Sequence, residues 1–183
     1  MLQWNELKQV CSSCTKCKLA NSRKNLVFGE GNENAKLMFI GEAPGEQEDL
    51  QGIPFVGRSG QLLDKILKAV DLSRQDVYIA NILKCRPPNN RDPLKEEKNM
   101  CINYLRNQVY LIKPKIIVCL GRVAAQTIIN PSFKITQQHG KWVERKGYYL
   151  TAVYHPSALL RDPHKKRPTW EDFKEIKKKY DSL

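Results

Sequence analysis

Lys36-Leu-Met-Phe-Ile40 is a short, almost continuous apolar run, and a loop of small residues follows it directly. Val77-Tyr-Ile-Ala-Asn-Ile82 and Lys115-Ile-Ile-Val-Cys-Leu120 have the same character. Short runs that are rich in Ile and Val are typical of strands covered on both faces in a parallel sheet. Each run precedes a helical pattern, and this alternation predicts an α/β protein with right-handed crossovers.

The segments between these runs carry signals of helix ends. Ser59 is expected to cap the helix that follows it, and Asp92 is expected to be the N-cap of a helix with Pro93 at its first position. Gly121 precedes a third helix, expected over residues 122–129. Strands and helices therefore alternate along this part of the chain.

The remainder of the chain completes the predicted fold. Residues 141–154 predict a hairpin that turns at Gly147. A last helix is expected to begin near Thr169, whose hydroxyl can cap the Asp172 amide, and to pack Trp170, Phe173 and Ile176 on the body. We predict a three-layer α/β/α sandwich with a central, mainly parallel four-stranded sheet. The sequence shows no repeat or interdomain linker, so residues 1–183 are expected to form a single domain.

Charge and composition limit the class of partner. The 183 residues include 31 Lys and Arg but 19 Asp and Glu, which gives a formal net charge of +12. Such an excess favours a polyanion, above all nucleic acid, with a solvated basic surface as the alternative. The first ten residues, with Trp4, Glu6 and Lys8, predict neither a signal-peptide core nor a membrane span, so a cytoplasmic protein with no membrane partner is expected.

The spacing of four cysteines predicts one metal site. Cys14 and Cys17 form a close pair, and Cys85 and Cys101 follow far downstream as single residues. Thiolates that converge from separate segments suit one cluster. Because no second close pair and no neighbouring His is present, we favour an iron–sulfur cluster over a structural zinc ion. Buried free thiols are the third interpretation.

Three distinctive loops are expected at the carboxyl ends of the strands, where ligands bind in open α/β sheets. They are Gly41-Glu-Ala-Pro-Gly-Glu-Gln-Glu-Asp49, the segment from Asn81 to Asp92, and Tyr154-His-Pro-Ser157. Phe55 lies in a further, glycine-bracketed loop, where its ring can either stack on a base or fold back on the core. No G-x-G-x-x-G motif or Walker lysine is present, so nothing supports nucleoside triphosphate binding.

In combination, these motifs resemble the uracil-DNA glycosylase superfamily, most closely its iron–sulfur branch, the family 4 enzymes of bacteria and archaea. The matching pieces are Cys14-x-x-Cys17, Gly41-Glu-Ala-Pro-Gly45 with Glu48 and Asp49, Pro54-Phe-Val-Gly57, Asn81-Ile-Leu-Lys-Cys-Arg-Pro-Pro88, Cys101 and His155-Pro-Ser157. The resemblance runs nearly end to end. It implies a monofunctional glycosylase of base excision repair that flips uracil out of DNA and hydrolyses its N-glycosidic bond, leaving an abasic site.

The resemblance implies that the four cysteines of the predicted metal site hold a [4Fe–4S] cluster with a structural role. Cys11 lies outside the pattern and is interpreted as a bystander, and Cys119 as a core thiol. The resemblance also implies that uracil-containing DNA, single- or double-stranded, is the partner. A monomer is expected.

The resemblance assigns residues to the flipped base. It implies that Glu42 and Ala43 line the uracil pocket and that Phe55 stacks on the base. Asn81 pairs with the Watson–Crick edge, and His155 approaches O2. This agrees with the chemistry, because an extruded base is read through its edge and its face, and cleavage places negative charge on the uracil.

Two further parts of the site follow from the same resemblance. Glu42 and Glu48 are both candidates for orienting the water, and we favour Glu48 for the water and Glu42 for pocket geometry. Residues 86–92 contain no His, so the covalent adduct of a related branch is not expected. Asn90 is a candidate phosphate contact, and Leu159-Leu160-Arg161 resembles a segment that wedges into the duplex, with a packed helical turn as the alternative.

Two other functions are compatible with parts of the sequence. An iron–sulfur nucleic-acid-binding module would keep the fold without releasing free uracil from DNA. An electron-transfer or metabolic iron–sulfur enzyme would cycle its cluster under mild reductant and would be indifferent to DNA. The basic charge and the base-reading motifs argue against the second alternative.

Overall fold

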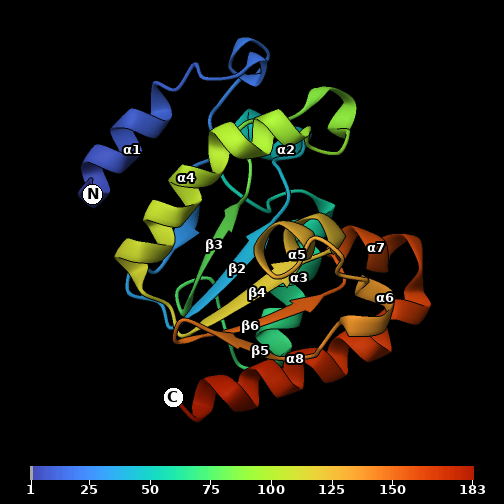
Figure 1. Ribbon diagram of the computed structural model, residues 1–183. Helices are drawn as coiled ribbons and strands as arrows, with labels where there is room; N and C mark the ends of the chain where they lie inside the picture. The colour runs from blue at the N-terminus through green and yellow to red at the C-terminus, as the bar shows by residue number, and fades with distance from the viewer. Residues whose placement is uncertain (1) are drawn as a thin grey trace.

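The computed structural model describes residues 2–183 and is built around a six-stranded sheet with the order β1-β3-β2-β4-β6-β5 (Figure 1). The strands are β1 (Glu30–Gly31), β2 (Leu37–Gly41), β3 (Val77–Asn81), β4 (Ile116–Leu120), β5 (Val143–Arg145) and β6 (Tyr148–Val153). β2, β3, β4 and β6 run parallel, and β1 and β5 pair antiparallel at the two edges. The four parallel strands confirm the predicted sheet, and the edge strands extend it to six.

Helices lie between the strands in the chain and also after the last strand. The α-helices are α1 (Trp4–Ser12), α2 (Glu46–Gln51), α3 (Arg58–Ala69), α4 (Lys95–Ile112), α5 (Arg122–Ile128), α6 (Ile135–Gln138), α7 (Pro156–Arg161) and α8 (Lys166–Asp181). Short 3₁₀ turns are η1 (Lys18–Asn21), η2 (Pro88–Asn90) and η3 (Pro163–Lys165). No helix within residues 2–183 is long and apolar enough to cross a membrane.

The two faces of the sheet have separate apolar cores, which confirms the three-layer arrangement. Successive side chains of a strand point to opposite faces. Met38 of β2 belongs to a core that includes Leu105 of α4, whereas Phe39 belongs to a core with Leu63 of α3. Phe39 also stacks on Phe173 of α8, with the ring centroids 5.8 Å apart. The central strands are therefore buried on both sides, as their apolar runs predicted.

The structure corrects three of the expected helix starts. α4 begins at Lys95, because the Glu97 carboxylate accepts a hydrogen bond from the Leu94 amide at 2.8 Å, whereas Asp92 forms an ion pair outside the helix. α3 begins at Arg58, one residue before Ser59.

α8 also begins earlier than predicted. It starts at Lys166, and the Thr169 hydroxyl donates to the Lys165 carbonyl at 2.8 Å instead of capping. Phe173 and Ile176 are each 1% exposed and pack on the body as predicted, whereas Trp170 is 37% exposed, so the prediction was wrong for Trp170. The hairpin with a turn at Gly147 is confirmed.

Candidate active site and four-cysteine site

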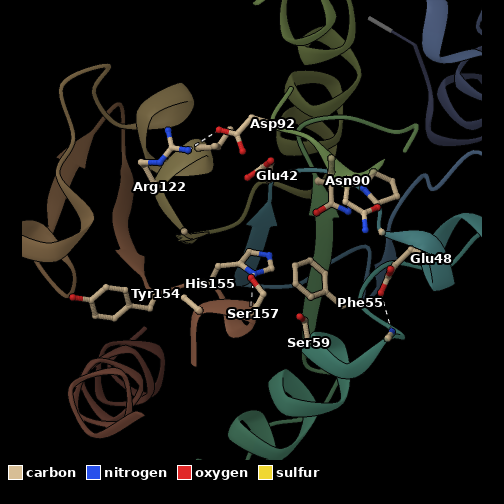
Figure 2. A pocket seen from close by; sticks show the side chains of 18 of the residues that line it. Glu42, Glu48, Phe55, Ser59, Asn90, Asp92, Arg122, Tyr154, His155 and Ser157 are labelled. Carbon is tan, nitrogen blue, oxygen red and sulfur yellow. Dashed lines mark hydrogen bonds and ion pairs between the residues drawn. The ribbon is translucent and has the colours of Figure 1, made fainter. Parts of the chain in front are cut away.

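A pocket of about 670 Å³ opens at the carboxyl ends of β2, β3, β4 and β6 (Figure 2). We call it the base pocket. The sequence-predicted residues that line it are Glu42, Ala43, Glu48, Phe55, Asn81, Asn90, His155 and Arg161. Parallel strands bring the loops that follow them to one edge of the sheet, which explains why residues so distant in sequence meet here.

Asn81 ends β3 and supplies the pocket with an unpaired acceptor. The residue is only 2% exposed, and its Oδ1 atom has no hydrogen-bond partner within residues 2–183. Gly41 lies opposite it in β2. A Cβ atom at position 41 would come within 2.7 Å of the Phe55 ring and would collide with Asn81 Oδ1. Glycine is therefore what allows Asn81 and Phe55 to approach each other.

Phe55 is held in a backbone conformation that non-glycine residues rarely adopt. Its φ angle is 53°, and such strain persists only where neighbouring groups enforce it. Arg74 donates to the carbonyl oxygens of Pro54, at 2.8 Å, and of Phe55 itself. The buried ring lies 5.7 Å from the His155 ring between centroids, so the two rings form one wall of the pocket (Figure 2).

Glu48 supports the same loop from α2. Its Oε1 atom accepts hydrogen bonds from the amides of Val56, at 2.9 Å, and Gly57, at 2.8 Å. Its Oε2 atom lies beside Gly45, where a Cβ atom would come within 2.7 Å of it. One carboxylate oxygen is thus committed to positioning the loop that carries Phe55.

Glu42 lies directly after β2 and faces the centre of the base pocket (Figure 2). Burial raises the pKa of its carboxyl to about 7, and the neighbouring Asp92 carboxylate adds to the rise, while Arg122 and Lys98 oppose it. Asp92 and Arg122 form an ion pair at 2.6 Å. Near neutral pH, the Glu42 side chain is therefore divided between its neutral and charged forms.

His155 is the N-cap of α7 and carries its free ring nitrogen toward the pocket (Figure 2). Its Nδ1 atom accepts from the Ser157 amide at 3.1 Å and lies 2.8 Å from the Ser157 hydroxyl. Burial, reinforced by Arg161, lowers the pKa of the imidazole to about 4. A neutral ring that accepts at Nδ1 carries its proton on Nε2, and Nε2–H is then available as a donor.

The two segments predicted to contact DNA are placed differently. Asn90 lies in the pocket wall with a φ of 53°, and its Oδ1 atom accepts from Arg86 Nε at 2.8 Å. In α7, Leu159 is 1% exposed and belongs to the interior, whereas Leu160 is 40% exposed. A side chain that wedges into DNA must lie at the surface, so Leu159 cannot serve as the wedge. Of the two leucines, only Leu160 is exposed.

Several pocket residues were not singled out by the sequence reasoning. Arg58, Arg91, Arg122 and Lys165 line the pocket, and Asp92 was predicted only as a helix cap. The position of Arg122 directly after Gly121, at the end of a predicted strand, is the one signal that could have identified it. The others depend on which loops the fold brings together.

A second, smaller pocket lies between the N-terminal segment, the chain after β3 and α4, and we call it the four-cysteine pocket. Cys14, Cys17, Cys85 and Cys101 all line it. Cys11 does not line this pocket. It is buried beside Leu7 in a small core between α1 and α4.

Hydrogen-bond donors point at two of the four sulfur atoms. The Arg23 guanidinium donates to Cys85 Sγ at 3.3 Å and to the Cys14 carbonyl at 2.8 Å, which ties the N-terminal pair to the chain after β3. The Lys84 amide donates to Cys101 Sγ at 3.3 Å. Such N–H···S contacts stabilise thiolates.

Burial disfavours the charged thiolate form of two of these cysteines. It raises the pKa of Cys101 to about 11, against the lowering effect of Lys84, and it also raises the pKa of Cys85. All six cysteines are free. Within residues 2–183, no group of three or more His, Cys, Asp and Glu side chains is arranged to hold a metal ion.

Comparison with known proteins identifies the family of this chain. The family model of the uracil DNA glycosylase superfamily matches residues 28–174. The chain therefore belongs to the uracil-DNA glycosylase superfamily.

More specifically, the chain belongs to the type-4 uracil-DNA glycosylases, because curated relatives of that name match it over most of their length. The chain is 49% identical over 172 residues to the type-4 uracil-DNA glycosylase of Archaeoglobus fulgidus. This alignment covers 90% of the chain and 86% of the relative. It is 44% identical to the type-4 uracil-DNA glycosylase of Sulfurisphaera tokodaii, over 94% of this chain and 82% of the relative. It is 42% identical to the type-4 uracil-DNA glycosylase of Thermotoga maritima, over 86% of this chain and 85% of the relative.

Proposed function

We propose that this protein is a uracil-DNA glycosylase, which flips uracil out of DNA and hydrolyses the N-glycosidic bond to leave an abasic site. The observation that carries the proposal is the buried, unpaired Oδ1 atom of Asn81 in a pocket that also presents an aromatic ring and a neutral histidine. A base that has left the duplex is recognised by hydrogen bonds to its edge and by stacking on its face.

Asn81 reads the base edge in this proposal. Its Oδ1 atom accepts from N3–H of uracil, and its amide group donates to O4. Cytosine presents a bare N3 atom and an amino group at the same places, so one orientation of the amide cannot satisfy both bases. Phe55 supplies the stacking face.

His155 acts on the leaving group. As the N-glycosidic bond breaks, negative charge develops on the uracil and positive charge on the sugar. The Nε2–H group of a neutral His155 can donate to uracil O2 without a proton being taken up beforehand. Loop amides of residues 41–45 complete this stabilisation.

A carboxylate supports the sugar and orients the attacking water. Because Glu48 Oε1 holds the Phe55 loop, its Oε2 atom is the part of that carboxylate left for the water. Glu42 shapes the pocket and, in its charged form, adds negative charge near the sugar. Glu48 therefore remains our candidate for orienting the water.

We further propose that the four-cysteine pocket holds a [4Fe–4S] cluster. The chemistry of the donors fits, because four thiols from three separate segments line one pocket and two of the sulfurs accept N–H groups, although no three of these side chains within residues 2–183 are spaced around a single metal position. When bound, the cluster supplies a covalent link between these segments, and it takes no part in the cleavage. Since the ligands must be thiolates, binding releases protons.

DNA is held by the basic rim of the base pocket. Arg58, Arg122, Arg161 and Lys165 line it together with Asn90, and the net charge of +12 is consistent with contacts to phosphates. We propose that the exposed Leu160 enters the base stack that the uracil leaves. A single domain that acts as a monomer remains our expectation.

Base release from defined DNA tests this function. The purified protein should release free uracil from a uracil-containing oligonucleotide and leave matched cytosine and thymine oligonucleotides intact. Asn81→Asp replaces the amide donor with an acceptor. It should weaken the recognition of uracil by about 1–3 kcal/mol of lost hydrogen bonding and narrow the difference between the excision rates of uracil and cytosine. A protein that binds the uracil oligonucleotide without releasing base is a binding module instead.

A further inference from the structure

Lys84 is a completely buried lysine between Asn81 of the base pocket and Cys85 of the four-cysteine pocket. A buried ammonium group is costly unless its N–H groups find acceptors. Lys84 Nζ donates to the carbonyl oxygens of Asn81 and Phe28, each at 3.0 Å, and to Gln108 Oε1 at 2.7 Å. These three acceptors account for all three of its protons, so the position of the head group is fully specified.

Gln108, which helps to hold Lys84, is itself fixed. Its side chain is fully buried in α4, and its Nε2 atom donates to the Phe28 carbonyl at 2.9 Å and to the Tyr78 hydroxyl at 3.3 Å. We call Lys84, Gln108 and their partners Phe28 and Tyr78 the Lys84 network. A network in which each member is satisfied is rigid.

Asn81 is where this network meets the base pocket. The chain after Asn81 stays attached to the end of β2, because the amides of Ile82 and Leu83 donate to the carbonyls of Gly41, at 3.0 Å, and Glu42, at 3.1 Å. The Lys84 side chain then folds back three residues and binds the Asn81 carbonyl. The Lys84 side chain thereby fixes the backbone of Asn81, whose Oδ1 atom is unpaired.

We propose that Lys84 is a positioning residue for Asn81, whose ammonium group holds the Asn81 backbone so that Oδ1 faces N3–H of a bound uracil. The inference rests on the proposed function, since it concerns how that pocket binds uracil. Small displacements of a positioned group weaken its hydrogen bonds steeply. The backbone amide of the same residue donates to Cys101 Sγ, so Lys84 also joins the base pocket to the four-cysteine pocket.

Two buried variants of the Lys84 network separate positioning from stability. Lys84→Met removes the clamp on Asn81, whereas Tyr78→Phe removes a buried hydroxyl of the same network and leaves all three hydrogen bonds of Lys84 Nζ in place. For both variants and the wild type, we would measure the inhibition constant of free uracil, the single-turnover rate on uracil DNA, DNA affinity, iron content and the melting temperature.

A specific loss of uracil recognition is expected. Lys84→Met should weaken inhibition by free uracil and slow the single-turnover rate by about tenfold, with DNA affinity unchanged. Tyr78→Phe should lower the melting temperature but keep both uracil-dependent values near those of the wild type. Equal losses in the two variants mean that lost stability is the cause, and they overturn the positioning role.

Other outcomes also decide the question. If Lys84→Met does not fold, Lys84→Gln replaces it, because its amide still offers N–H groups to the buried acceptors. Its side chain is shorter than that of lysine and lacks the ammonium group, so it should show the same loss of uracil inhibition. If neither variant folds, Lys84 is a stability residue and the proposal is overturned. A wild-type protein that releases no uracil contradicts the proposed function, whereas an active wild type with an equally active Lys84→Met contradicts only the role of Lys84.

Discussion

His155 and Glu42 share one pocket, yet burial moves the pKa values of their side chains in opposite directions. The pKa of His155 is lowered to about 4 and that of Glu42 is raised to about 7. Both shifts have the same physical cause, because burial disfavours the charged form of any group. The site therefore presents a neutral donor beside a carboxyl that titrates near neutral pH.

Replacing His155 should slow chemistry more than it weakens binding. His155→Ala is expected to reduce the single-turnover rate by about 10²-fold or more, as for the loss of an oxyanion donor, while DNA affinity is retained. His164→Ala is the matched control, because His164 lies exposed in η3. A His155→Ala protein that cleaves at the wild-type rate but binds DNA weakly would assign His155 to positioning alone.

Glu42 should make stability depend on pH. Its carboxyl binds a proton more tightly in the folded state, so its contribution to stability is present below the ordinary pKa of 4.5 and is lost as the pH rises through about 7. Glu42→Gln should therefore stabilise the protein against urea at pH 8, by about 1–3 kcal/mol, and have little effect at pH 4. The exposed Glu46→Gln is the control. An equal effect of Glu42→Gln at both pH values would contradict the assignment.

At the scale of elements, the four-cysteine pocket joins α4 to the N-terminal segment and to the end of β3. Arg23 links the N-terminal pair to Cys85, and Lys84 reaches Cys101 in α4. Lys84 and Cys85, which take part in these contacts, lie only three and four residues after Asn81. Order in the four-cysteine pocket and order at the end of β3 are thus expected to be coupled.

Removing one thiol tests this arrangement. Cys85→Ala should lose iron and lower the melting temperature, because the free energy of ligand binding contributes to folding. Cys119→Ala makes the same chemical change in the core of β4, away from the four-cysteine pocket, and should retain iron. Iron and sulfide analysis beside melting curves decides the matter, and a stable, iron-loaded Cys85→Ala protein would remove Cys85 from the ligand set.

At the scale of the whole molecule, basic residues meet at the mouth of the base pocket. Arg161 belongs to α7 and Lys165 to η3, and both line the pocket that the parallel strands open. Positive charge placed there serves both electrostatic attraction and direct contacts to phosphates.

The dependence of DNA affinity on salt should report these contacts. Arg161→Ala and Lys165→Ala are each expected to reduce the slope of log K against log salt concentration by about one and to weaken binding to all sequences alike. Lys179→Ala is the control, because Lys179 packs 3.8 Å from the centroid of the Tyr149 ring and does not line the pocket. An unchanged slope in both pocket variants would place the DNA elsewhere.

Local sequence determined the parallel strands and the hairpin, because apolar runs and turn residues are local signals. Cys14, Cys17, Cys85 and Cys101 come from separate segments, and the fold brings them into one pocket. Tertiary structure alone decided the rest. Glu97, not Asp92, caps α4; two-residue β1 has no apolar pattern to reveal it; and Leu159 is buried by its neighbours. The shifted pKa values of Glu42 and His155 and the clamp of Lys84 on Asn81 depend on burial and on partners distant in sequence, which only the folded chain brings together.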